Sequence, residues 1–196
     1  MSSWNDFNDA QSQNFDLIPK GTIVKVRLTI RPGGYNDEQQ SWAGGYATRN
    51  ANTGAVYLNC EYTVLEGKYA RRKVFSLIGL MSPKGPEWAN MGRSLVRGIL
   101  NSAHGISDKD SSPQALAKRR IRSFAELDGV EFLARIDIGK DTSGEAKNEI
   151  RVAVTPDHKD YATHVGAVAA RPVAQPVSDP TADPARGPGV RPAWAQ

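Results

Sequence analysis

Alternating apolar and polar residues predict five strands in this chain. In residues 21–31, four aliphatic side chains alternate with lysine, arginine and threonine, which is the pattern of a strand buried on one face. Similar alternation recurs four times, and the turn Gly67-Lys68 between the second and third segments predicts a hairpin. The glycine- and asparagine-rich residues 33–54 are expected to form a long loop. The predicted strands cover residues 21–31, 55–66, 70–80, 130–138 and 148–155.

Between the third and fourth strands the apolar spacing changes to three and four residues. Trp88, Met91 and Leu95 follow this spacing and predict an amphipathic helix that Gly105 ends. A shorter helix is expected after Ser112, which is a favourable N-cap residue, and a single further turn follows it. The predicted helical segments cover residues 86–103, 113–121 and 123–127.

The order of these elements is typical of one small β fold. Three strands, a helical segment and two further strands occur in this order in the OB-fold, a five-stranded and partly open Greek-key barrel. We therefore predict a mainly β protein with an OB-like barrel and a helical insertion between its third and fourth strands. An SH3-like barrel and an open antiparallel sheet with one helix are the alternatives.

Composition divides the chain into three parts. Residues 1–15 are polar with isolated aromatic residues, and they predict a flexible arm whose aromatic side chains rest on the domain surface. Residues 16–165 contain the predicted strands and helices and form the OB-like domain. In residues 166–196 every fourth residue from Pro172 on is proline, and no large apolar side chain occurs before Trp194. Such a tail cannot bury enough apolar area to fold, so we expect it to be disordered with polyproline II character.

Composition also excludes several classes of protein. The single cysteine, Cys60, allows no internal disulfide and no cysteine-based zinc site, and its strand position predicts a buried thiol. Three scattered histidines suggest no metal site, so we expect no metal and no cofactor. No apolar run approaches the roughly 20 residues of a membrane-spanning helix, and the polar N-terminus is no secretory signal. We therefore expect a cytoplasmic protein without a membrane partner. The net charge of +4 is compatible with a nucleic-acid partner.

In an OB-fold the binding surface is the face of the second and third strands together with the two loops beside it. Here these segments combine aromatic, amide and cationic side chains. Single-stranded nucleic acid needs both kinds, because each base can stack on an aromatic ring, worth about 1–3 kcal/mol, and each phosphate attracts a cation. The candidate nucleic-acid-binding residues are Trp42, Tyr46, Arg49, Tyr57, Asn59, Arg71, Arg72, Lys73, Lys140 and Lys147.

Several of these candidates also have a structural interpretation. Trp42 can pin its loop to the barrel, and Tyr57 can be half-buried under that loop. The basic run at residues 71–73 can be a solvated hairpin end. A second basic cluster at residues 118–122 can be an exposed helix face or an extension of the path for a nucleic-acid backbone. The acidic side chains of Asp37, Glu38 and Glu61 lie near the expected surface and count against it.

Two segments resemble a known group of proteins. A strand that opens after Pro-x-Gly, then Leu-Glu-Gly-x-Tyr, then Arg-Lys-x-Phe, is similar to small phage-encoded proteins that are often encoded among replication and recombination genes. Some of these are OB-fold single-stranded-DNA-binding proteins. The resemblance covers residues 17–80 and, more loosely, residues 125–155. Its matching positions are Pro19, Gly21, Leu65, Glu66, Gly67, Tyr69, Arg72, Lys73 and Phe75.

The tail departs from the bacterial single-stranded-DNA-binding proteins. Those proteins usually end in a glycine-rich tail with an acidic, aromatic-tipped terminus that recruits partners. The tail of this chain is proline-rich and nearly neutral, with three arginines and two aspartates, and it shares only the linker character and the terminal aromatic Trp194. The same set of partners is therefore not implied.

No catalytic motif occurs in the chain, and the best carboxylate pair, Asp108 with Asp110, lacks a third ligand for Mg²⁺, so we expect a non-enzyme. We predict a sequence-independent single-stranded-DNA-binding protein that serves phage replication or recombination in the cytoplasm of the host cell. Trp194 is expected to bind a replication or recombination protein. The alternative is a non-enzymatic interaction module, a phage accessory or virion-associated protein, that uses the barrel face and the proline-rich tail. The oligomeric state, including a homo-oligomer, is left open.

Overall fold

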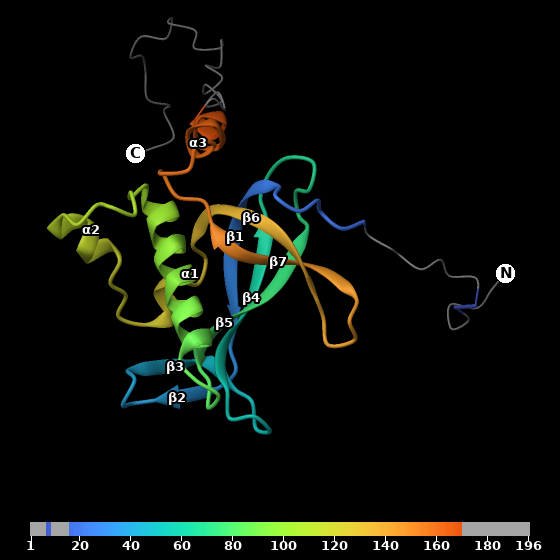
Figure 1. Cartoon of the computed structure of the whole chain (residues 1–196), viewed down its shortest axis with the longest axis vertical. Coiled ribbons are helices and arrows are strands. Elements are labelled where there is room, and N and C mark those ends of the chain that lie inside the picture. Colours follow the sequence, from blue (N-terminus) through green and yellow to red (C-terminus); the bar gives the residue numbers. More distant parts are fainter. Residues whose placement is uncertain (1–6, 9–15, 170–196) are drawn as a thin grey trace, which may run out of the picture.

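The computed structural model describes residues 7–8 and 16–169 of the chain (Figure 1). Most of the predicted arm and most of the predicted tail, including Trp194, lie outside the described residues. The strands are β1 (Ile23–Arg31), β2 (Tyr35–Asp37), β3 (Trp42–Arg49), β4 (Val56–Val64), β5 (Lys73–Met81), β6 (Glu131–Lys140) and β7 (Ala146–Ala153). The helices are α1 (Glu87–His104), α2 (Pro113–Lys118), the 3₁₀ turn η1 (Phe124–Glu126) and α3 (Tyr161–Ala169).

The strands form one curled antiparallel sheet, a half-barrel. Its order is β2-β3-β4-β1-β6-β7, and β5 pairs with the other edge of β4. The curl brings β5 close to β7, where the Ser76 hydroxyl donates a hydrogen bond of 3.2 Å to the carbonyl oxygen of Ile150. The mainly β prediction is therefore confirmed, and so is the predicted hairpin, which pairs β4 with β5 from Val56–Met81 to Thr63–Lys73.

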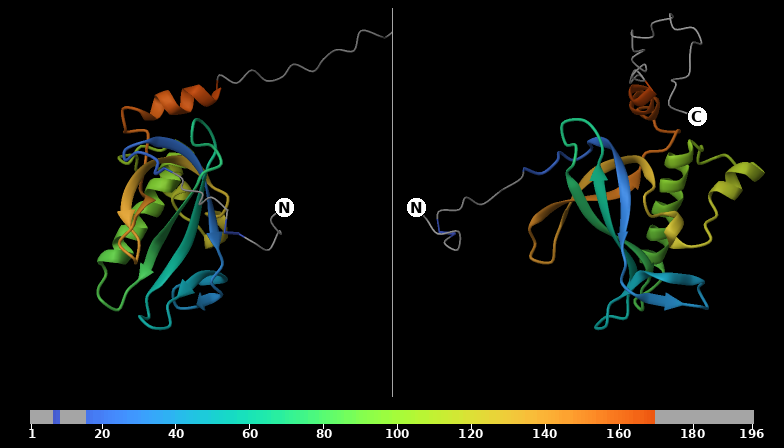
Figure 2. Two further views of the ribbon diagram at one scale, coloured as in Figure 1. Left: turned by 90° about the vertical axis from the view of Figure 1, so that its right-hand side faces the viewer. Right: turned by 180° about the vertical axis from the view of Figure 1, so that it is seen from behind.

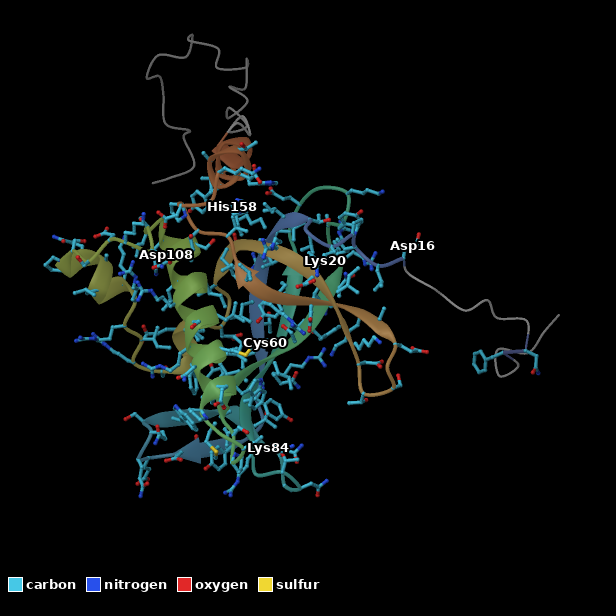
Figure 3. All side chains as sticks on the ribbon, viewed as in Figure 1. Asp16, Lys20, Cys60, Lys84, Asp108 and His158 are labelled. Carbon is cyan, nitrogen blue, oxygen red and sulfur yellow. The ribbon has the colours of Figure 1, made fainter. Side chains whose placement is uncertain are left out.

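Alternate residues of the strands fill the inside of the curl. Val26 and Leu28 of β1 and Leu58 and Tyr62 of β4 are fully buried there. Cys60 is also buried, as its strand position predicted, and burial raises the pKa of its thiol to about 12 (Figure 3).

Helix α1 lies along one side of the curled sheet, against β5, β6 and β7 (Figures 1 and 2). Its backbone approaches β5 so closely that a Cβ atom on Gly92 would overlap the carbonyl oxygen of Gly79. Gly105 ends the helix in the left-handed conformation, φ 64°, with its N–H directed at the last carbonyl groups. The helix and its end were both predicted from the sequence.

Two segments differ from the sequence prediction. The expectation of an unbroken loop at residues 33–54 is wrong, because this segment contains the β2–β3 hairpin, which joins the sheet by pairing β3 with β4. Gly44 and Gly45 of β3 adopt φ 82° and 68° where the register between β2 and β3 shifts, and the Asn36 side chain accepts a hydrogen bond of 2.8 Å from the Gly45 N–H. Helix α2 ends at Lys118 rather than at residue 121. Its N-cap was predicted correctly, since the Ser112 hydroxyl accepts a hydrogen bond from the Ala115 N–H.

Helix α3 crosses the expected boundary between residues 165 and 166, and it rests on the end of α1, where the Tyr161 hydroxyl donates a hydrogen bond of 2.9 Å to the Ser102 carbonyl. Within the described ranges, neither α1 nor any other helix combines the length and the apolar character that a membrane crossing requires.

Candidate nucleic-acid interface

The outward side chains of β1, β4 and β5 form one continuous surface, which we call the outer face. They have the opposite parity to the buried positions of the same strands, and antiparallel pairing aligns them in rows across the sheet. One row joins Thr29, Glu61 and Phe75, and the next joins Arg31, Asn59 and Leu77. The outer face consists of Arg27, Thr29, Arg31, Tyr57, Asn59, Glu61, Thr63, Lys73, Phe75 and Leu77.

Two large apolar side chains lie exposed in the middle of the outer face. Phe75 is 43% and Leu77 is 48% exposed, although both belong to a strand that pairs along its length with β4. The Arg31 guanidinium lies over the Phe75 ring, 4.9 Å from its centroid, which is a cation–π arrangement. An exposed aromatic ring next to a cation is the combination that a stacking base and its phosphate require.

Glu61 occupies the centre of the outer face between two cations. Its carboxylate lies 2.6 Å from the Lys73 ammonium and 2.6 Å from the Arg31 guanidinium. Hydrogen bonds from Lys73 and then from Arg31 lower the pKa of the Glu61 carboxyl. The carboxylate therefore does not cancel the positive charge of this surface. It holds two cations close together, and the group of three side chains keeps one positive charge in excess.

A second carboxylate lies between two cations where β1 pairs with β6. Glu131 receives the Arg27 guanidinium at 2.6 Å and the Lys25 ammonium at 3.0 Å. Arg27 and then Lys25 lower the pKa of the Glu131 carboxyl through these hydrogen bonds. This group also has one positive charge in excess.

An aromatic pair borders the outer face where β4 and β5 meet α1. The Tyr57 and Trp88 rings lie 6.2 Å apart, and Trp88 lies directly over Gly79, where a Cβ atom would overlap the indole. Tyr57 is thus half-buried, but its cover is the first turn of α1 and not the loop that the structural interpretation proposed. Because Gly79 has no side chain, the indole lies flat against the strand.

The candidates of the β2–β3 hairpin pack against neighbours instead. Trp42 contacts Phe124 of η1, with ring centroids 6.2 Å apart, and both pack against the core. The Arg49 guanidinium lies 5.6 Å from the centre of the Tyr35 ring, and Tyr46 is partly buried against the core. This geometry favours the interpretation of Trp42 as the residue that pins its segment to the barrel.

The basic run at residues 71–73 is divided by the fold. Arg71 adopts the left-handed conformation, φ 69°, in the turn between β4 and β5. Arg72 donates a hydrogen bond of 2.9 Å to the Asp16 carbonyl and so ties the start of the described domain to this turn. Of the three residues, Lys73 is the one whose side chain joins the outer face.

The other cationic candidates lie on different parts of the fold. Lys140 and Lys147 lie exposed at the turn end of the β6–β7 hairpin, where the register aligns Lys140 with Ala146 and Gly139 with Lys147. The second basic cluster is built around a structural residue, because Arg119 donates hydrogen bonds to the Asn101 side chain and to the carbonyl groups of Ser107 and Asp110.

The carboxylates of the loop that follows α1, among them Asp108 (labelled in Figure 3), accept hydrogen bonds from neighbouring parts of the chain. Asp108 accepts hydrogen bonds from the Asn101 amide at 2.6 Å and from the Thr155 hydroxyl at 3.1 Å. Asp110 accepts one from the backbone N–H of Ser112 at 2.8 Å. In the described part of the chain, no three histidine, cysteine or acidic side chains are grouped as metal ligands.

Sequence reasoning missed four residues of this surface: Arg31, Phe75 and Leu77 as exposed contacts, and Trp88 as the cover of Gly79. A signal for two of them was present, because β5 is apolar at both parities. Val74 and Ile78 fill the buried side, so Phe75 and Leu77 must point outward. For Trp88, helical spacing predicted only a core position.

No protein-family model and no curated protein matches the chain. The resemblance to phage-encoded proteins stays a prediction that rests on the residues named above.

Proposed function

We propose that this protein binds single-stranded DNA without sequence preference and is not an enzyme. The observation that carries the proposal is the exposed Phe75 ring in the middle of a strand pair, with Arg31 over it and Lys73 beside it. In this proposal bases stack on Phe75 and on the Tyr57–Trp88 pair, and Leu77 adds apolar contact. Phosphates contact Lys73, Arg31 and the hairpin lysines Lys140 and Lys147.

The strand pairing supports the proposal that the half-barrel is an OB-fold. The pairs β1–β4, β4–β5, β1–β6 and β6–β7, with β5 next to β7, match the five strands of such a barrel, and α1 lies between its third and fourth strands. In that description the outer face corresponds to the second and third strands, and β2 and β3 are an elaboration of the first loop.

The same exposed apolar side chains also favour a second candidate function, a protein-interaction module. Leu77 and Met91, the latter 62% exposed on α1, would suit an apolar partner surface as well as a base. Two further proposals accompany this one. The first is that Trp194, which lies outside the described residues, recruits a replication or recombination protein. The second is that the protein acts in the cytoplasm of an infected host.

Titration of the full chain with labelled oligo-dT at several salt concentrations tests the proposed function. We expect affinity to fall steeply with salt, and a duplex of equal length to bind more weakly because its bases offer no free face. Phe75→Ala should weaken binding by about 1–3 kcal/mol with an unchanged melting temperature.

The matched control is Leu116→Ala, since Leu116 is an exposed residue, 53%, on α2 and outside the outer face. Equal affinity for single strand and duplex, or equal affinity of the Phe75→Ala variant and the unchanged chain, would contradict the stacking model and favour the protein-interaction module.

A further inference from the structure

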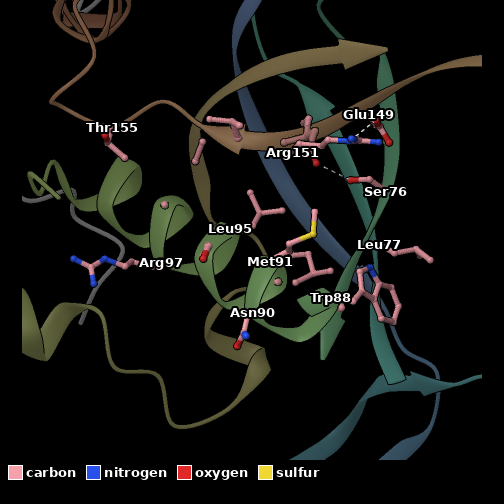
Figure 4. Close-up of a pocket in the computed structure, with 18 of the residues that line it drawn as sticks. Ser76, Leu77, Trp88, Asn90, Met91, Leu95, Arg97, Glu149, Arg151 and Thr155 are labelled. Atoms are coloured by element: carbon pink, nitrogen blue, oxygen red, sulfur yellow. Dashed lines mark hydrogen bonds and ion pairs between the residues drawn. The ribbon is translucent and has the colours of Figure 1, made fainter. Parts of the chain in front are cut away.

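A groove of about 1350 Å³ runs between α1 and the adjoining strands β5 and β7 (Figure 4). It lies where the curled sheet does not close, beside the hydrogen bond from Ser76 to Ile150. We call it the α1 groove. Its apolar lining includes Leu77, Trp88, Met91, Leu95 and Val152.

The lining of the α1 groove is exposed as well as apolar. Met91 is 62% and Val152 is 42% exposed, from opposite walls. Leu77 belongs both to the groove and to the outer face, and the Trp88 ring lies at the same border. The groove and the outer face are therefore one continuous surface that turns around β5.

Charge is distributed unevenly along the α1 groove. Lys140 and Lys147 come from the β6–β7 hairpin, and Arg151 follows on β7, where its guanidinium lies 2.5 Å from the Glu149 carboxylate (Figure 4). At the other end of the groove, in the C-terminal half of α1, Arg97 donates a hydrogen bond to the Asp108 carbonyl. The groove as a whole has four cations and four carboxylates. Three of the four cations lie at the end next to the β6–β7 hairpin, so this end is the part that suits phosphates.

We propose that single-stranded DNA leaves the outer face over Leu77 and Trp88 and continues into the α1 groove. This inference rests on the proposed function and extends its binding path. The part of α1 that lines the groove runs from Glu87 to Gly98, about 18 Å at 1.5 Å per residue. That length accommodates about five nucleotides at the 3.4 Å spacing of one duplex strand, and fewer when the strand is stretched.

The chemistry of the groove fits bases better than a fully charged ligand. The flexible thioether of Met91 and the flat indole of Trp88 can adapt to any base, which agrees with binding without sequence preference. Lys140, Lys147 and Arg151 supply cations on the side where the strand enters. An apolar peptide would use the floor of the groove but would make no use of the exposed lysines Lys140 and Lys147.

A length series of oligo-dT on the full chain tests the path, with Met91→Glu as the variant. Oligomers of about four nucleotides can be held by the outer face alone, and oligomers of about fourteen reach both surfaces. We expect Met91→Glu to lower the affinity for the long oligomer about tenfold and to leave the affinity for the short one unchanged. Leu116→Glu introduces the same carboxylate at an apolar helix residue of similar exposure outside both surfaces, and it should alter neither affinity.

Four results separate the possible failures. If no oligomer binds to the unchanged chain, the proposed function fails and this inference fails with it. If oligomers bind but Met91→Glu and Leu116→Glu behave alike, the path is wrong while the proposed function stands, and the groove is then a candidate for a protein segment. An equal loss for short and long oligomers would also overturn the path.

Photo-crosslinking of the long oligomer to the unchanged chain supplies the fourth result, which needs no variant. Crosslinks in residues 91–98 or 149–153, which line the groove beyond Trp88 and Lys147, support the path, and their absence from both segments overturns it.

Discussion

The β2–β3 hairpin and the outer face contain the same kinds of side chain but use them differently. In the hairpin, Trp42 packs on Phe124 and Arg49 lies over Tyr35, so aromatic rings and cations contact other parts of the fold. On the outer face, Phe75 and Leu77 remain about half exposed. The difference teaches that aromatic and cationic composition selects candidate surfaces, but the neighbours that the fold provides decide which rings are available to a ligand.

The largest expected effect comes from removing the hairpin's anchor. Trp42→Ala deletes a ring that packs against the core and against Phe124, so we expect a loss of about 2–3 kcal/mol in the free energy of unfolding. Affinity for oligo-dT should stay within about twofold of that of the unchanged chain. Denaturant unfolding and titration measure the two quantities. A variant of unchanged stability that binds DNA weakly would reverse the assignment of Trp42.

One cation from each region gives the next comparison. Lys73→Ala removes a cation of the outer face and should reduce the slope of log affinity against log salt by about 0.7, the value for one phosphate contact on a single strand. Arg49→Ala removes a cation that lies over Tyr35, and it should leave this slope unchanged. Equal changes in slope for the two variants would mean that the hairpin lies in the DNA path.

The smallest effect concerns the carboxylate at the centre of the outer face. The pKa of Glu61 is below its usual 4.5, so the stability that its ion pairs add is complete above that pH and is lost as the pH falls through the lowered value. Glu61→Gln should remove this part of the acid destabilisation, as measured by melting temperature from pH 7 to pH 3. It should also raise affinity for oligo-dT about twofold, because Arg31 and Lys73 then face phosphate alone. A fall in affinity would show that Glu61 chiefly positions the two cations.

The sequence predicted the sheet well because strand patterns are local. Alternation in β1 and β4 identifies their buried residues, and the helical spacing of Met91 and Leu95 identifies α1. The β2–β3 hairpin escaped prediction because its strands are rich in small residues and gain their order by pairing with β4, as in the Ala47–Leu58 pair.

The candidate site was harder to predict because it depends on contacts between distant segments. Arg31 and Phe75 are far apart in the chain and meet only through β4, which lies between their strands. The two alternatives for Trp42 could not be separated without Phe124, which is more than eighty residues away in the sequence. Lys73 was a candidate from the sequence and lies on the outer face, whereas Glu61 counted against this surface because its two cationic partners could not be seen in the sequence.

The contact between Gly92 and Gly79 fixes the position of α1 relative to β5, and so affects both the outer face and the α1 groove. The missing Cβ of Gly92 lets the helix rest directly on the backbone of β5, and the missing Cβ of Gly79 leaves room for the Trp88 indole. A Cβ atom at either position would push the first turn of α1 away from β5 and separate the Trp88 ring from the Tyr57 ring. The spacing between the Tyr57–Trp88 pair and the α1 groove is therefore encoded in two residues that have no side chain.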